Sequence, residues 1–277
     1  WLMHGTRGGL AAGVLFVLPS LLILIALSAI YIAFGQVAWV AGILYGIKPA
    51  VAALVVQALH RMGSKTLKKP STAPVLWAVA ASSFVAIHIF QIAFPWIVLG
   101  AGLIGWAMQK MASTSTPPTK STSTASVFSW KALGHCVRVV GVGLALWLLP
   151  VAALVAWQGW DSTLVAMAWF FTKAALLTFG GAYAVLPYVY QGAVEQFHWL
   201  TAAQMMDGLA LGETTPGPLI MVVAFIGFVG GWAKEVLGAN HLFWGGALAA
   251  CVVTWFTFLP SFIFIFAGAP LVESTHN

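Results

Sequence analysis

The chain has 277 residues, of which 61% are hydrophobic and only 6% are charged. A soluble globular domain carries about 25% charged residues, so this composition excludes that class. A lipid bilayer accounts for it, because each spanning helix presents roughly 20 predominantly apolar residues to lipid. The net charge is +6, but the basic residues lie mostly in loops, which is typical of membrane proteins rather than of nucleic-acid-binding grooves. The sequence therefore predicts an all-α, polytopic membrane helix bundle that contacts lipid and no nucleic acid.

Apolar runs follow one another along the chain. They are residues 9–34, 36–59, 74–108, 139–157, 163–190, 216–232 and 241–271. The run 74–108 is too long for one ordinary span. Pro95 is the expected break, because proline removes a backbone donor and clashes with the preceding helical turn. If every other run is a single span, the chain has about eight membrane segments.

Two stretches are basic and contain no acidic residue. They hold Arg61, Lys65, Lys68 and Lys69 in the first, and Lys110, Lys120, Lys131 and Arg138 in the second. Basic loops are retained in the cytoplasm, so an even number of spans separates these two stretches. Two spans on either side of Pro95 satisfy that condition. Counting back by two more spans places Arg7 and the N-terminal segment on the cytoplasmic side as well.

Residues 113–126, STSTPPTKSTSTAS, are almost wholly Ser, Thr and Pro. Such a tract cannot bury enough apolar area to order itself, so it is typical of a flexible linker. We assign residues 111–130 to this linker. It separates a first membrane domain, residues 1–110, from a second, residues 131–277.

A weak repeat links the two domains. Gly8-Gly9-Leu10 precedes a run with Leu18-Pro19-Ser20, and Gly245-Gly246-Ala247 precedes a run with Leu259-Pro260-Ser261. By the span count the first of these helices runs outward and the second inward. Two inverted-topology repeats are a recurring architecture of secondary transporters, so the sequence predicts that arrangement here.

Helix-breaking residues gather in the second domain. One group is Phe179-Gly180-Gly181, and the other is residues 212–218, GETTPGP. Hydrocarbon cannot satisfy the backbone groups freed by such breaks, so they face protein or a watery cavity. A half-helix beginning at Pro216 and Pro218 would direct its positive end at that cavity, beside the hydroxyls of Thr214 and Thr215. Close helix packing and a simple loop turn explain the same residues, and both readings stay open here.

A few charged residues lie in or beside the apolar runs. Lys173 lies between the start of its run and Phe179, and Lys48 precedes Pro49. Each lysine is either a functional cation or one that extends to the membrane surface. Glu213 either carries a coupling proton or caps the half-helix, and Asp207 lies on an amphipathic loop or helix.

Enzyme signatures are missing from the sequence. There is no His-Glu-x-x-His, no Gly-x-Ser-x-Gly, no phosphate-binding loop and no cysteine cluster, since Cys136 and Cys251 stand alone. We therefore expect a protein that is not an enzyme and that needs no metal and no organic cofactor. The sequence leaves the oligomeric state open, a homo-oligomer included.

The ordered motifs resemble the chromate ion transporter (CHR) family. In the second domain they are Phe171-Thr172-Lys173, Phe179-Gly180-Gly181, Trp199-Leu200-Thr201, residues 207–218 (DGLALGETTPGP) and Phe225-Ile226-Gly227-Phe228. In the first they are residues 4–10 (HGTRGGL), residues 16–20 (FVLPS) and residues 46–51 (GIKPAV). The first domain lacks its own Phe-Gly-Gly and Pro-Gly-Pro segments, so we expect a chain truncated at the N-terminus, and at the C-terminus after Asn277.

The resemblance implies two homologous domains of opposed orientation in a bacterial inner membrane, and export of chromate. We expect a secondary transporter, with a carrier for sulfate or another tetrahedral oxyanion as the alternative and a membrane enzyme or assembly subunit as the more distant one. The expected substrate site combines backbone and hydroxyl donors with countercharges. Its residues are Gly180, Gly181, Thr214, Thr215 and Gly217, with Lys173, Arg7 and Lys48 as the cations.

Overall fold

A computed structural model describes residues 5–35, 37–67, 74–90, 92, 94–112, 130–178 and 182–274, and these residues are helical with short turns. The helices confirm the all-α membrane bundle. They are α1 Gly5–Phe34, α2 Ala38–Thr66, α3 Pro74–His88, α4 Phe94–Ala112, α5 Trp130–Gln158, α6 Thr163–Leu176, α7 Ala182–Tyr190, the π-helix η1 Gln191–Gln196, α8 Ala202–Thr214, the 3₁₀ helix η2 Leu219–Met221, α9 Val222–Ala233, η3 Ala239–His241 and α10 Leu242–Ser274. The low-complexity tract lies outside the described residues.

The chain forms two compact units. One contains Trp1–Ala53 and Ser129–Asn277, and the other contains Leu54–Phe128. Within the second unit the long apolar run is interrupted after His88, and α4 begins at Phe94. Pro95 thus lies in the first turn of a helix, where its missing N–H group costs nothing. The predicted break in this run is confirmed.

Helix length separates the spanning elements from the shorter ones. Within the described residues, four helical segments are long and apolar enough to cross a bilayer: Gly5–Phe34, Ala38–Thr66, Gly134–Gln158 and Ala239–Gly268. By contrast, α6 has 14 residues and rises about 21 Å, which is short of a hydrocarbon core of about 30 Å. The short helices on either side of the two Gly/Pro-rich breaks therefore cannot each cross the bilayer as a single span.

The apolar run 163–190 folds back on itself. The α6 helix begins after Ser162, whose hydroxyl accepts a hydrogen bond from the Val165 N–H. Phe170 of α6 stacks on Tyr188 of α7 with ring centroids 4.9 Å apart. In one continuous helix these residues would be about 27 Å apart, so α6 and α7 form a hairpin. The prediction of a single span over this run is wrong, because the two described helices of the run pack against each other instead of following one another in one line.

A second hairpin follows the first. Its first arm, α8, begins with a capping box in which Thr201 and Gln204 satisfy each other's backbone N–H groups. Its return arm is η2 with α9, and a Cβ on Gly208 of α8 would overlap the Phe225 ring of α9. The predicted span 216–232 is therefore one arm of a hairpin, and each hairpin returns to the side from which it started.

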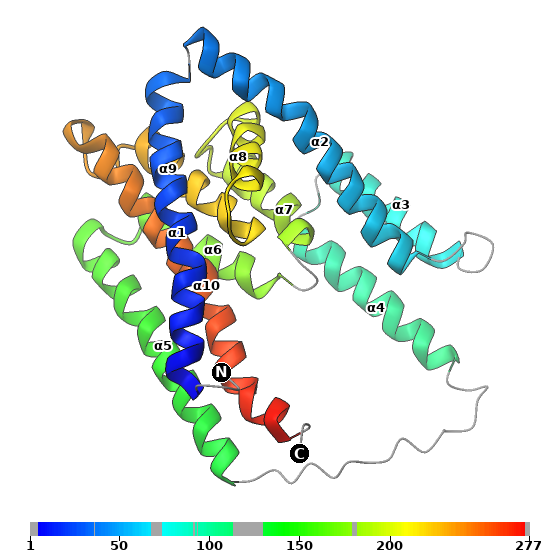
Figure 1. Cartoon of the computed structure of the whole chain (residues 1–277). Helices are drawn as coiled ribbons and strands as arrows, with labels where there is room; N and C mark the ends of the chain where they lie inside the picture. The colour runs from blue at the N-terminus through cyan, green and yellow to red at the C-terminus, as the bar shows by residue number, and fades with distance from the viewer. Residues whose placement is uncertain are drawn as a thin grey trace. The chain divides into compact units, whose positions relative to one another are not determined.

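Helices α1 and α10 cross each other beside these hairpins and run in opposite directions (Figure 1). A Cβ on Gly13 of α1 would overlap Phe262 of α10. The α9 helix packs on α10 through small residues, since a Cβ on Gly227 would lie 2.8 Å from the Ala249 carbonyl oxygen. Small residues at such interfaces let helix backbones approach closely. The opposed direction of α1 and α10 is what an inverted repeat requires, and the repeat itself stays a prediction.

Candidate functional site

The tip of the second hairpin, residues 215–218, lies against the middle of α1. The Ser20 hydroxyl donates a hydrogen bond to the Pro216 carbonyl oxygen, and Ser20 is 1% exposed. Ser20 stands halfway along Gly5–Phe34, a helix long enough to cross the bilayer. The tip therefore lies near mid-membrane, where hydrocarbon offers no hydrogen bonds and protein must satisfy the freed carbonyl.

Gly217 gives this tip its shape. Its φ is +143°, in a region that favours glycine, and a Cβ there would overlap the Ser20 hydroxyl. After Gly217 the chain is extended at Pro218, and η2 then leads into α9. The N-terminal end of this return arm therefore lies at the tip. Its first N–H groups have no partner within the helix, and the helix dipole places partial positive charge there.

The two threonines of the tip donate to their own helix. The Thr214 hydroxyl donates to the Leu211 carbonyl at 3.0 Å, and the Thr215 hydroxyl donates to the Gly212 carbonyl at 2.9 Å. A hydroxyl has one proton, so each must rotate before it can donate to a bound anion. Their hydroxyl role stays a prediction. Gly180 and Gly181 lie outside the described residues.

Glu213 connects the two hairpins. Its Oε1 accepts a hydrogen bond of 2.6 Å from the Tyr183 hydroxyl of α7. Glu213 is partly buried in the last turn of α8, one residue before Thr214. Its carboxylate is thus held toward α7, and its assignment as a coupling group or a cap is still a prediction.

A polar cluster that sequence reasoning missed joins α1, α2 and α8. Asp207 Oδ2 accepts a hydrogen bond of 3.0 Å from the Tyr31 hydroxyl, and Asp207 Oδ1 lies 2.9 Å from Lys48 Nζ. The Asp207 side chain is 8% exposed and that of Lys48 is 34% exposed. The sequence signal was present, since the chain holds only 6 acidic residues and one of them lies near an apolar break. Their pairing was invisible because Lys48 and Asp207 are far apart in the chain.

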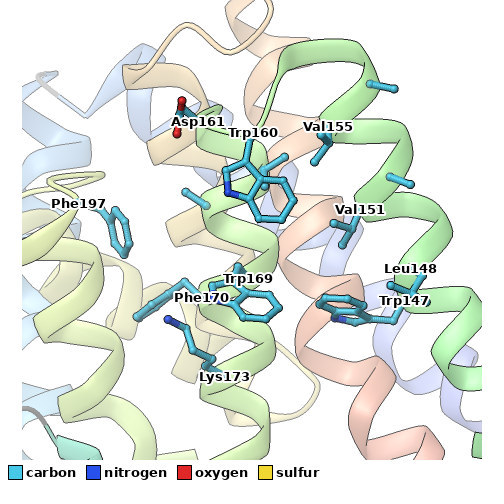
Figure 2. A pocket seen from close by; sticks show the side chains of 14 residues that line it. Trp147, Leu148, Val151, Val155, Trp160, Asp161, Trp169, Phe170, Lys173 and Phe197 are labelled. Carbon is cyan, nitrogen blue, oxygen red and sulfur yellow. The ribbon is translucent and has the colours of Figure 1, made fainter.

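Lys173 lies elsewhere, in a groove of about 760 Å³ between α5 and α6. Figure 2 shows Lys173 beside Trp169 and Phe170 at one end of the groove, with Trp147 facing Trp169 from α5 and Asp161 at the other end. The Lys173 side chain is exposed, and the residues that line its groove include none from the tip of the second hairpin. The structure therefore does not bring Lys173 together with Gly217 or with Lys48.

Arg7 is also distant from the tip. It is exposed in the first turns of α1, about 20 Å along the helix axis from Ser20. The described residues therefore bring the tip, α1 and the hairpin connection at Glu213 together, and place the Tyr31–Asp207–Lys48 cluster further along α1 and α8. The helix N-terminus at the tip is an arrangement that binds anions.

The chain is similar to known proteins of one family. The sequence profile of the family described as "Chromate transporter" matches residues 1–106 and 165–277. A chromate transport protein from Pseudomonas aeruginosa is 35% identical over 94% of this chain and 55% of its own length. One from Cupriavidus metallidurans is 28% identical over 95% of this chain and 56% of its own length.

A probable chromate transport protein from Synechococcus elongatus is 27% identical over 96% of this chain and 58% of its own length. The chain thus spans about half the length of these relatives. No solved structure matches it. The profile match covers most of the chain, in two separate segments that include α1, the second hairpin and all but the first two residues of the first hairpin. The chain therefore belongs to the chromate transporter family.

Proposed function

We propose that the protein containing this chain is a secondary transporter that exports chromate across a bacterial inner membrane. The observation that carries the proposal is a broken helical hairpin whose tip contacts the middle of the long apolar helix α1, in a chain of the chromate transporter family. Secondary transporters bind substrate near the bilayer midplane, where the ends of discontinuous helices meet.

The tip supplies the chemistry that a tetrahedral dianion needs. The return arm that leads into α9 directs N–H groups and the positive end of its dipole at the tip, where Gly217 lets the Ser20 hydroxyl approach the backbone. Thr214 and Thr215 add hydroxyls after rotation, and Lys48 supplies positive charge from α2. Lys173 offers a further positive charge in its own groove between α5 and α6, apart from the tip. The opposed directions of α1 and α10 support a carrier whose two repeats expose the site alternately to each side.

The proposal is tested by uptake of radiolabelled chromate into everted membrane vesicles. The vesicles are made from cells that express the full-length protein that contains this chain. Everted vesicles expose the cytoplasmic face, so an exporter accumulates chromate in their lumen. Accumulation above that of vesicles without the protein, abolished by dissipating the ion gradients, is the expected result. No accumulation by correctly inserted protein contradicts the proposal.

Sulfate competition then decides between the substrates. Sulfate and chromate are both tetrahedral dianions, so a site built from N–H groups and cations accepts both in shape and charge. Chromate uptake that falls only at a large molar excess of sulfate supports a chromate carrier. Inhibition by sulfate at equal concentration identifies a general oxyanion carrier. Uptake into right-side-out vesicles but not into everted ones would show that the protein imports the oxyanion, the reverse of the proposed direction.

A further inference from the structure

The Tyr31–Asp207–Lys48 cluster has the composition of an occupied anion site. A phenol hydroxyl and an ammonium each hold one oxygen of the same carboxylate, at 3.0 Å and 2.9 Å. The Lys48 contact is an ion pair without hydrogen-bond alignment, since Asp207 Oδ1 accepts no hydrogen bond from the described residues. The same two donors fit two oxygens of any small oxyanion.

The cluster also lies next to both arms of the second hairpin. Its three residues come from α1, α2 and α8, and α8 is the arm that leads to the tip. Asp207 lies two turns before Thr214, about 10 Å along the axis of α8. Tyr31 packs edge-on against Phe225 of α9, with centroids 5.3 Å apart, so the cluster contacts both arms of the hairpin.

Building on the proposed function, we propose that Lys48 and Tyr31 form a second oxyanion subsite that the Asp207 carboxylate occupies in this state. A transported dianion and Asp207 compete for the two donors. When the dianion takes them, Asp207 is released and binds a proton. The cluster is thus the place where oxyanion movement is coupled to proton movement.

The proton follows from charge balance. With Lys48 and Asp207 paired, the cluster carries no net charge. A dianion that replaced the carboxylate would leave two negative charges in excess if Asp207 stayed ionised, in a site where Asp207 is 6% exposed. Protonation of Asp207 reduces the excess to one. Tyr31 and Lys48 are the titratable groups that face Asp207 from α1 and α2, and α9 contributes none, since Val222–Ala233 contains no titratable residue.

The first test measures chromate binding to the purified full-length protein in detergent, as a function of pH. In the wild type, binding requires a protonated Asp207, so affinity rises as pH falls, by about tenfold per pH unit for one linked proton. Asp207→Asn removes the competing charge and keeps the shape. We expect this variant to bind chromate at least about tenfold more tightly at alkaline pH, without that slope. Protonation of chromate itself affects both proteins equally.

Two further variants keep the test specific. Glu195→Gln changes an exposed acid outside the cluster, so it retains the wild-type slope. Glu213→Gln changes the other acid of α8. If this variant loses the slope while Asp207→Asn retains it, coupling belongs to Glu213 and the inference is overturned. Weakened binding in a folded Asp207→Asn protein overturns it too, because a competitor cannot be required for binding.

A second measurement uses the wild type alone, in case Asp207→Asn does not fold. Chromate is added at alkaline pH, where it is a dianion, to the protein in weakly buffered solution with a pH indicator. We expect net proton uptake that saturates with binding, and binding without proton uptake overturns the inference. No chromate or sulfate binding at any pH overturns the proposed function itself, and the inference with it. Binding without linkage leaves the proposed function standing and removes only the coupling.

Discussion

At the scale of single residues, the two lysines of the apolar runs have different surroundings. Lys48 is paired with the largely buried Asp207, whereas Lys173 is exposed in a groove lined by Trp147 and Trp169. A cation inside a spanning segment is costly unless it has a partner or reaches water. Lys48 meets that condition through its ion pair. Lys173 meets it only if the groove admits water or an anion, which makes it the sharper test of the proposed function.

Lys173→Ala is expected to abolish chromate uptake into everted vesicles while the protein remains in the membrane. The side chain is exposed, so its removal leaves the packing of α6 intact and withdraws only the positive charge. Lys234→Ala is the matched control, since Lys234 is an exposed lysine at the C-terminal end of α9. Uptake at the wild-type rate in Lys173→Ala would remove this residue from the site.

We expect Gly217→Ala to lower the free energy of unfolding by more than the cost of placing an alanine at a positive φ. An alanine at a left-handed position costs about 1–2 kcal/mol, and overlap of its Cβ with Ser20 adds about 1–3 kcal/mol. Gly238→Ala isolates the first effect, because Gly238 has a φ of +81° and nothing within 4 Å of a Cβ. Thermal unfolding in detergent compares the two. Equal loss in both would show that contact with Ser20 contributes nothing.

At the scale of elements, the breaks in the apolar runs decide the fold. Apolar length predicted a single span over 163–190, but the chain reverses there and Phe170 meets Tyr188. Composition could not reveal this, because a hairpin of two short apolar arms has the same hydropathy as one long helix. The Gly/Pro-rich breaks were recognised as sites where a helix is interrupted. Whether the chain then continues or returns depends on contacts with α9 and with Trp199, which no local pattern contains.

Close packing of α9 on α10 yields a prediction at this scale. Gly227→Ala places a Cβ 2.8 Å from the Ala249 backbone oxygen, which must move, so we expect a loss of about 1–3 kcal/mol in stability. Gly105→Ala in α4 is the control, because a Cβ there has no neighbour within 4 Å and alanine favours helix. Unfolding in detergent should show Gly227→Ala below the wild type and Gly105→Ala at or above it. The reverse order would mean that α9 and α10 are not in contact.

At the scale of the whole molecule, membrane topology follows from the hairpins. Each hairpin returns to its starting side, so we expect the turn at Asp161 and the segment near Gln196 to lie on the same side of the membrane. A single span over 163–190 would place them on opposite sides. The basic loop around Ser64 is predicted to be cytoplasmic, on the side opposite to Asp161.

Cysteine labelling measures this topology. In a protein with Cys136 and Cys251 replaced by Ser, single cysteines are introduced by Asp161→Cys, Gln196→Cys and Ser64→Cys. An impermeant maleimide applied to intact spheroplasts should label the first two and not the third, and a permeant maleimide should label all three. Labelling of Gln196→Cys only after the cells are opened would restore the single span.

Membership of the chromate transporter family confirms the resemblance that the motifs carried, and it places the chain among transporters rather than enzymes. The profile matches in two segments, one on each side of the low-complexity tract, whereas the compact units join α1 and part of α2 to the second segment. Homology follows the order of the chain and packing follows contact, so the two divisions need not coincide. The division into homologous domains stays a prediction.

The sequence by itself determined that the chain lies in a lipid bilayer, that it is helical, that a helix breaks before Pro95 and which family it belongs to. Each of these depends on composition or on short local motifs. The break at residues 216–218 could also be predicted, because Gly and Pro change the conformation of their own backbone. Only the tertiary structure decided that run 163–190 is a hairpin and run 216–232 one arm of another, that Ser20 contacts the tip and that Lys48 pairs with Asp207. Those features join residues far apart in the chain, and the free energy that selects them comes from packing and charge pairing that no local pattern encodes.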